Sequence, residues 1–129
     1  MNKTFLIIAS LLGALAVALG AFGAHGLKQI ADVDTVAAFQ TGVQYQMYHS
    51  LALLATAIIF ERFPNKWIRW AGNCYVMGII LFSGSLYLLT ALKATDQTGL
   101  KGIGIITPFG GIFFILGWMF LFAGIIKKN

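Results

Sequence analysis

Four long stretches of this chain contain no charged residue, and the charges gather in the short segments around them. The stretches cover residues 5–24, 43–60, 70–92 and 102–126, and none holds Asp, Glu, Lys or Arg. Each is close to the length of about 20 residues with which an α-helix crosses the hydrocarbon core of a bilayer. The pattern therefore predicts an all-α integral membrane protein, a bundle of four transmembrane helices.

Composition strengthens this prediction. Charged residues make up 10% of the chain, whereas they make up about 25% of a typical soluble domain. A length of 129 residues suits one domain, which we expect to cover residues 1–129 without a separate catalytic module. The single cysteine, Cys74, excludes an internal disulfide and a cage of cysteine ligands for a metal. We interpret it as a small apolar filler near one end of the third stretch.

The distribution of charge predicts the orientation in the membrane. If the four helices alternate in direction, one side of the membrane collects most of the basic residues: Lys3, Arg62, Lys66, Arg69, Lys127 and Lys128. On the other side, acidic residues balance the basic ones: Asp32, Asp34 and Asp96 against Lys28, Lys93 and Lys101. Cytoplasmic loops carry the excess of Lys and Arg, so we expect both termini in the cytoplasm. The net charge of +5 beside apolar helices indicates contact with anionic lipid rather than nucleic acid.

The connection between the first two stretches, residues 28–42, has a helical pattern of its own. Asp34 is suited to cap a helix, and apolar residues follow it at helical spacing: Val36, Phe39 and Val43. We expect a short helix that lies at the membrane interface, between the first and second transmembrane helices, and bends near Gly42 into the second.

Small residues at helical spacing predict where the helices touch, because helices associate in lipid by close backbone packing. The first stretch carries a stripe of them on one helix face: Ala9, Gly13, Ala16, Gly20 and Ala24. The fourth carries two rows at seven-residue spacing, one of Gly104 and Gly111 and one of Gly110, Gly117 and Gly124. We therefore expect the fourth helix to be buried against at least two neighbours. Pro108 within it removes a backbone hydrogen bond and predicts a kink or a broken turn.

Polar side chains inside these helices are the best candidates for a binding site, because such groups are costly in a membrane. A rise of roughly 1.5 Å per residue brings them to similar depths in the outer half of the bundle. The candidates for ligand binding come from separate parts of the chain: His25, Tyr45, Tyr48, His49, Ser83, Ser85, Thr107 and Pro108. We expect five of these to line one polar pocket: His25, Tyr45, His49, Ser83 and Thr107.

The two histidines have structural as well as functional interpretations. His49 shares a helix face with Tyr45, and its neutral ring would be satisfied by hydrogen bonds to a neighbouring helix. His25, close to glycines at positions 23 and 26, would cap the end of the first helix. Alternatively, both rings would bind a metal or ligate a haem from adjacent antiparallel helices, although no third strong ligand lies at short spacing.

Four runs of the sequence point to a known family. They are GAFGAHGL (20–27), YQMYHSLALL (45–54), FSGSLYLL (82–89) and GIITPFGGIFFILGW (104–118). In these runs the chain resembles the YgdD/YwdK-like family of small integral membrane proteins, which is labelled domain of unknown function 423. The resemblance implies a multi-pass protein of the bacterial cytoplasmic (inner) membrane, and it implies no established activity.

Together these observations favour a non-enzymatic bundle, without a cofactor, that binds a lipid, a small ligand or a partner in its outer-leaflet half. Ser83 and Ser85 have no Asp or Glu at their depth to support hydrolysis. We expect membrane lipids as partners, together with a second copy of the chain or another membrane protein. Two alternatives stay open: a small channel or transporter gated by His49, and a redox protein with haem or metal bound by His25 and His49.

Overall fold

The computed structural model of the chain describes residues 1–95 and 100–127, so Asp96 and Lys128 lie outside the described residues. Within these ranges there are helices and turns but no strand, and the prediction of an all-α fold is confirmed. The helices follow one another with short connections: α1 (Lys3–Ala24), the 3₁₀ turn η1 (Leu27–Gln29), α2 (Val33–Ile59), α3 (Lys66–Gly78), the π-helical turn η2 (Ile79–Ser83), α4 (Gly84–Ala94) and α5 (Leu100–Ile126).

Three helical segments are long and apolar enough to cross a membrane: Lys3–Gln29, Lys66–Ala94 and Gly102–Ile126. The middle one joins α3, η2 and α4 into a single run. Helix α2 has 27 residues but carries more polar side chains than the others, so the count of four transmembrane helices stays a prediction.

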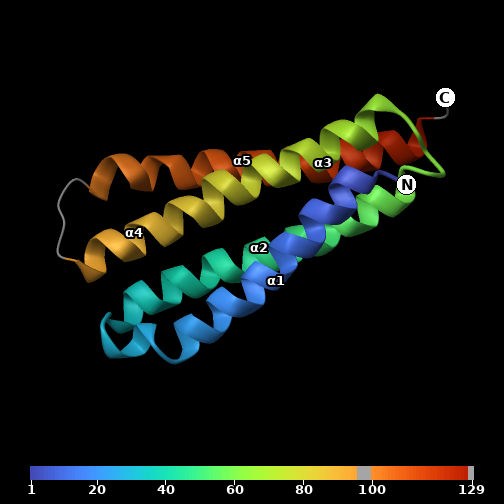
Figure 1. Ribbon diagram of the computed structural model, residues 1–129. Coiled ribbons are helices and arrows are strands. Elements are labelled where there is room, and N and C mark those ends of the chain that lie inside the picture. The colour runs from blue at the N-terminus through green and yellow to red at the C-terminus, as the bar shows by residue number, and fades with distance from the viewer. Residues whose placement is uncertain (96–99, 128–129) are drawn as a thin grey trace.

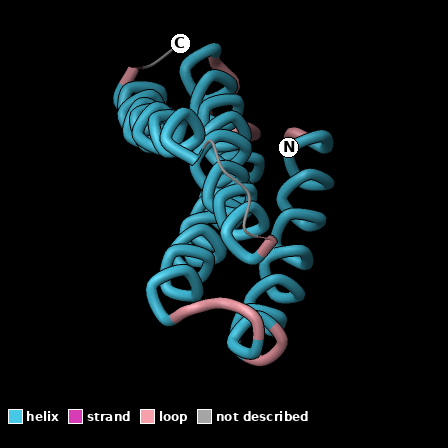
Figure 2. The backbone as a smooth tube through the Cα atoms, turned by 90° about the vertical axis from the view of Figure 1, so that its left-hand side faces the viewer, coloured by secondary structure: helices cyan, strands magenta, loops and turns pink. Residues whose placement is uncertain are grey.

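The helices pack as an open array in the order α1, α2, the α3–η2–α4 run, α5. Helix α1 packs against α2, α2 packs against the α3–η2–α4 run, and α5 packs against the other side of that run. Figure 1 shows that α1 begins and α5 ends at the same end of the molecule, which we call the termini end. Figure 2 shows the two outer helices of the array on opposite sides. The core consequently lies along α2 and the α3–η2–α4 run.

Side-chain caps explain where three of the helices begin. Asn2, Asp32 and Asn65 each accept a hydrogen bond from a backbone N–H three residues ahead, which satisfies a donor that the first helical turn leaves free. The predicted cap Asp34 is wrong, because it lies inside the first turn of α2. Hydrogen bonds from the Thr35 side chain and backbone hold the pKa of Asp32 below its ordinary value. The capping carboxylate is therefore charged at neutral pH, and its contribution is lost as the pH falls through that lowered pKa.

The predicted interfacial helix with a bend at Gly42 is not formed, because α2 runs without a break from Val33 to Ile59. Gly42 has a packing role instead. A Cβ atom there would lie 3.1 Å from the Tyr87 ring and 3.3 Å from Leu86, and the Gly42 carbonyl accepts a hydrogen bond of 2.6 Å from the Ser83 hydroxyl. The absence of a side chain thus lets α2 and the α3–η2–α4 run approach closely.

The irregular turn lies in the third helical run and not in the fourth. Helix α5 continues through Pro108, so the predicted broken turn is absent there. The π-helical turn η2 instead widens the run opposite Gly110, where a Cβ atom would lie 2.7 Å from the Phe82 Cα atom. A π turn accommodates one extra residue in the helix, and Gly110 leaves the room that this wider turn needs.

One of the two predicted glycine rows of α5 forms a packing seam. Gly110, Gly117 and Gly124 are buried, and the α3–η2–α4 run covers them with three side chains: Phe82, Tyr75 and Ile68. The other row does not pack in this way, since Gly104 is exposed and has nothing within 4 Å of a Cβ position. The expectation that α5 is buried against at least two neighbours is also wrong, because its backbone packs only on the α3–η2–α4 run and most of its large apolar side chains are exposed.

The predicted small-residue stripe of α1 faces α2 for part of its length. Ala9 and Ala16 are buried, and a Cβ atom at Gly20 would lie 3.3 Å from the Val43 side chain. Gly13 has nothing within 4 Å of its Cβ position. The outer face of α1 carries exposed Leu and Ile side chains, which suits contact with lipid tails.

Replacing Gly117 tests the seam. A leucine Cβ there would lie 2.6 Å from the Tyr75 ring and 3.3 Å from the Ala71 carbonyl oxygen, so the two helices must separate. We expect Gly117→Leu to cost about 1–3 kcal/mol of stability, measured by thermal unfolding in detergent. The same substitution at Gly104 serves as the control and should unfold like the wild type. Equal unfolding of both variants would contradict the seam.

Candidate functional site

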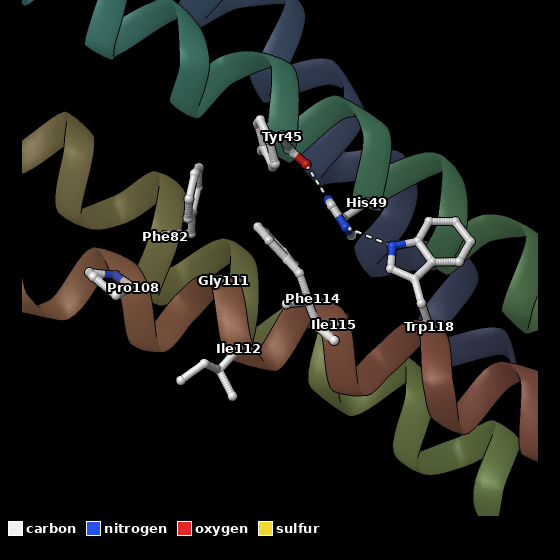
Figure 3. A pocket seen from close by; sticks show the side chains of 9 residues that line it. All are labelled: Tyr45, His49, Phe82, Pro108, Gly111, Ile112, Phe114, Ile115 and Trp118. Carbon is white, nitrogen blue, oxygen red and sulfur yellow. Dashed lines mark hydrogen bonds between the residues drawn. The ribbon is translucent and has the colours of Figure 1, made fainter.

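His49 lies midway along α2 and makes a hydrogen bond through each ring nitrogen. Its side chain is 5% exposed. Nδ1–H donates to the Tyr45 carbonyl oxygen at 2.8 Å, and Nε2 accepts from the indole N–H of Trp118 at 3.1 Å (Figure 3). Because a carbonyl only accepts and an indole N–H only donates, these partners assign the hydrogen to Nδ1. The ring is therefore a neutral imidazole in this arrangement.

Aromatic rings surround this imidazole. The Phe114 ring stacks on it with a centroid distance of 3.6 Å and an interplanar angle of 10°. Tyr75 and Trp118 lie edge-on or tilted at 5.6 Å and 5.9 Å. The backbones of α2 and α5 do not pack closely. Side chains bridge these helices instead, chiefly His49 against Phe114 and Trp118, with the Tyr45 ring also stacked on Phe114.

Beside this bridge, α2, η2 and α5 enclose a cleft of about 470 Å³. Its walls are mostly aromatic and aliphatic: Tyr45, His49, Phe82, Pro108, Gly111, Ile112, Phe114, Ile115 and Trp118. Ile112, Ile115 and Trp118 are all about half exposed or more. The cleft therefore opens sideways, towards the exposed face of α5 that carries these three side chains.

The cleft lies near the middle of the bundle, which differs from the predicted outer half. Phe114, which stacks on His49, is close to the midpoint of the 27-residue α5. The difference arises because α2 begins at Val33 and not at residue 43, which places His49 several turns inside the helix.

The predicted site residues do not meet in one polar pocket. Tyr45, His49 and Pro108 line the cleft, but His25 is exposed at the end of α1, where its Nδ1–H donates to the Ala21 carbonyl at 2.9 Å. The predicted capping role of His25 is thus observed. Tyr48 is 55% exposed and lies outside the cleft, with its ring 5.8 Å from that of Tyr45.

The predicted hydroxyl groups serve packing contacts between helices. Ser83 donates to the Gly42 carbonyl, as described above. Ser85 donates to the Phe82 carbonyl at 2.9 Å and also contacts the Thr107 hydroxyl, which joins α4 to α5. Tyr45 differs from these residues, because its hydroxyl makes no hydrogen bond among the described residues. Its side chain lies in the cleft wall, and the residue is 38% exposed. The buried Tyr75 hydroxyl also has no partner among the described residues.

Gln46 links α2 to two neighbouring helices through its side chain, and the sequence analysis missed it. The residue is 1% exposed. Its side-chain N–H donates to the Leu12 carbonyl of α1 at 2.8 Å, and its oxygen accepts from the Tyr87 hydroxyl of α4 at 2.6 Å. A glutamine within an apolar stretch indicates that it needs a polar partner inside the protein. The sequence does not identify that partner, because Tyr87 lies 41 residues away.

The histidines are not arranged as a pair of metal ligands. His25 lies at the end of α1, whereas both nitrogens of His49 are engaged in hydrogen bonds. Within residues 1–95 and 100–127, no three His, Cys, Asp or Glu side chains lie close enough together to hold a metal. To bind a haem iron or another metal through Nε2, His49 would first have to lose its hydrogen bond from the Trp118 indole.

Basic and aromatic side chains gather at the termini end. The Lys127 ammonium lies 4.1 Å from the Trp67 ring centroid, and the Lys66 ammonium lies 5.3 Å and 5.4 Å from the rings of Trp67 and Trp70. The two indoles contact each other at 5.2 Å, and the Phe120 ring packs against both, at 5.9 Å and 5.6 Å. Such cation–π contacts are typical of the headgroup level of a membrane, where Trp and Lys both concentrate.

Comparison with known proteins identifies the family. The profile of the family described as "Protein of unknown function (DUF423)" matches residues 19–111. The chain belongs to this family. The UPF0382 membrane protein of Haemophilus influenzae is 42% identical over 100% of this chain and 98% of its own length. The UPF0382 inner membrane protein YgdD of Escherichia coli is 36% identical over 98% of this chain and 92% of its own.

A third relative comes from another bacterium. The UPF0382 membrane protein YwdK of Bacillus subtilis is 39% identical over 97% of this chain and 98% of its own length. No solved structure matches the chain. The predicted resemblance to the YgdD/YwdK-like family is confirmed, and the chain is a multi-pass membrane protein of the DUF423 family.

The Gln46 link provides a stability test. Gln46→Met leaves the Tyr87 hydroxyl without its partner, so we expect a loss of about 1–3 kcal/mol. Tyr87→Phe leaves only the glutamine oxygen unpaired and should cost less. In the double variant the two losses should not add, and the difference measures their coupling. Denaturation in detergent of the wild type, the two single variants and the double variant completes this double-mutant cycle. If the two losses of stability simply add, a direct bond between Gln46 and Tyr87 is contradicted.

Proposed function

We propose that this protein crosses the membrane four times and binds a molecule dissolved in the bilayer, without converting it chemically. The observation that supports this function is the sideways-open aromatic cleft between α2 and α5, which lies midway along long apolar helices. A cleft in this position is accessible from the lipid phase. Membrane lipids are thus the first class of partner to consider.

The polarity of α2 is compatible with a fourth crossing. The side chains that make it less apolar include Gln46, Ser50 and Thr56, all of which are buried. Ser50 and Thr56 donate to backbone carbonyls one turn earlier in α2, at 2.6 Å and 2.7 Å, and Gln46 bonds to neighbouring helices. A helix can carry polar groups through a bilayer when the protein satisfies them internally. Helix α1 begins at the same end of the molecule at which α5 ends (Figure 1), and this also fits an even number of membrane crossings.

Binding without catalysis fits the chemistry of the cleft. The described lining residues include no carboxylate, lysine or cysteine, and the one titratable base, His49, has both nitrogens occupied. Ser83 and Ser85 donate to backbone carbonyls, and among the described residues neither forms a hydrogen bond with a histidine or a carboxylate that would activate it as a nucleophile. We therefore propose a binding or carrier protein and not an enzyme.

For orientation we propose that the termini end faces the cytoplasm of a bacterial cell. Lys66, Lys127 and the aromatic rings around them lie at this end, in keeping with the preference of cytoplasmic segments for basic residues. The relative from Escherichia coli carries the name inner membrane protein, which supports the same membrane for this chain.

Cysteine labelling in intact cells tests the orientation. In a Cys74→Ala background, a membrane-impermeant maleimide should label Gln29→Cys, which lies in the exposed turn η1. It should not label Lys66→Cys until the cells are opened. Labelling of Lys66→Cys in intact cells, with protection of Gln29→Cys, would reverse the proposed orientation.

Filling the cleft tests the binding function. A Cβ atom at Gly111 would meet only the Phe82 ring, at 4.0 Å, so a leucine there enters the cleft without disturbing the seam. We expect native mass spectrometry of the wild-type protein, extracted in mild detergent, to show a bound small molecule that Gly111→Leu loses. Gly104→Leu, the same change on the exposed side of α5, should retain it. Identical adducts on both variants would overturn the proposed cleft function.

A further inference from the structure

We propose that the ligand of this cleft is a prenylquinone, held by its flat carbonyl-bearing ring against the side chains of Tyr45, Phe82 and Phe114. This identification rests on the proposed binding function and names its ligand class. Three features of the cleft support it: its depth, the shape of its walls and its hydrogen-bonding capacity.

The depth of the cleft argues against a phospholipid headgroup. The hydrocarbon core of a bilayer is about 30 Å thick, so its midplane lies about 15 Å from the nearest layer of headgroups. Phe114 lies near the midpoint of the 27-residue α5, which places the cleft close to that midplane. A molecule with a polar head at this depth has to be neutral and soluble in the acyl region, as a prenylquinone is.

The walls of the cleft suit a flat ring. The Tyr45 and Phe82 rings lie 4.7 Å apart at 33°, and the Phe82 and Phe114 rings lie 5.5 Å apart at 53°. The Tyr45 and Phe114 rings are nearly parallel, at 27° and 6.2 Å. Gly111 lines the same cleft and adds no side chain that would cover these faces. The three rings pack on one another as one aromatic surface in the cleft wall. Such a surface binds a further flat ring by offset or edge-to-face stacking, which a saturated acyl chain does not require.

The hydrogen-bonding capacity of the cleft matches a carbonyl group. The Tyr45 hydroxyl is a donor without a partner among the described residues, and an unpaired hydroxyl is costly in an apolar medium. A quinone supplies two carbonyl acceptors, and no charge is needed on either side because the described lining residues carry none. The Trp118 N–H stays with His49, so Tyr45 is the donor for the ligand.

The outer edge of the cleft leaves a path for an isoprenoid tail. Ile112 and Ile115 line the cleft and are 52% and 64% exposed, so they form an apolar border to the lipid. Figure 3 shows Ile112 on the outer side of α5, pointing away from the rings. A tail that leaves along this border keeps the quinone ring inside and its apolar chain in the bilayer.

Tryptophan fluorescence provides the test, because quinones quench indoles at short range. The chain has three tryptophans, so Trp67→Phe with Trp70→Phe leaves Trp118 as the only reporter. In phosphatidylcholine nanodiscs, decylubiquinone should quench this reporter along a saturating curve. Trp118→Phe, which keeps the two remote indoles, should show only the linear quenching of random encounters.

Two variants in the reporter background make the test specific. Tyr45→Phe should weaken the saturating phase by about 5–10-fold, the value of one hydrogen bond, and Gly111→Leu should abolish it. Melting curves establish that each variant is folded, and Tyr45→Phe alone suffices if Gly111→Leu unfolds. Linear quenching of Trp118, or an unchanged curve in Tyr45→Phe, would overturn the quinone assignment. If Gly111→Leu nevertheless loses a bound molecule by mass spectrometry, the proposed function stands with another ligand.

Discussion

Polar groups inside long apolar helices have no water to bind, so each depends on a partner within the protein. In this molecule α2 carries the largest share of such groups. Gln46 reaches both α1 and α4, and the carbonyl of Gly42 receives the Ser83 hydroxyl. These bonds fix the register of α2 against both of its neighbours, α1 and the α3–η2–α4 run, because moving any of these helices along its axis would leave a buried donor or acceptor unpaired.

Helix α5 is attached by a different principle. Its glycine row lets the backbone approach the α3–η2–α4 run, and large side chains of that run fill the space. Towards α2 it offers only side-chain contacts, chiefly the stack of Phe114 on His49 and the bond from Trp118. The cleft lies where the hydrogen-bonded part of the bundle and the glycine-packed part meet without closing. Its position therefore follows from the two modes of packing.

The sequence predicted the helices better than it predicted the site. Charge-free stretches fix where long helices must lie, and the row of Gly110, Gly117 and Gly124 correctly indicated a close contact. The depth of His49 depended on where α2 begins, and continuity of the helix across Gly42 is decided by packing against α4. The pairing of Gln46 with Tyr87 needs the relative register of two helices, which a local pattern does not contain.

The π turn at Ile79–Ser83 has a consequence for the evolution of this chain. An extra residue in one turn rotates everything after it by about 100° relative to a regular α-helix. Tyr75 and Tyr87 are twelve residues apart, which would set them about 120° apart around a regular α-helix. The offset of the π turn brings them closer to one face, so that Tyr75 packs against His49 of α2 and Tyr87 donates to Gln46 of the same helix. Deleting a single residue within the turn would restore ideal helical geometry yet turn the second half of the run away from its partners. Insertions and deletions should consequently be tolerated in the connections but purged from this one turn.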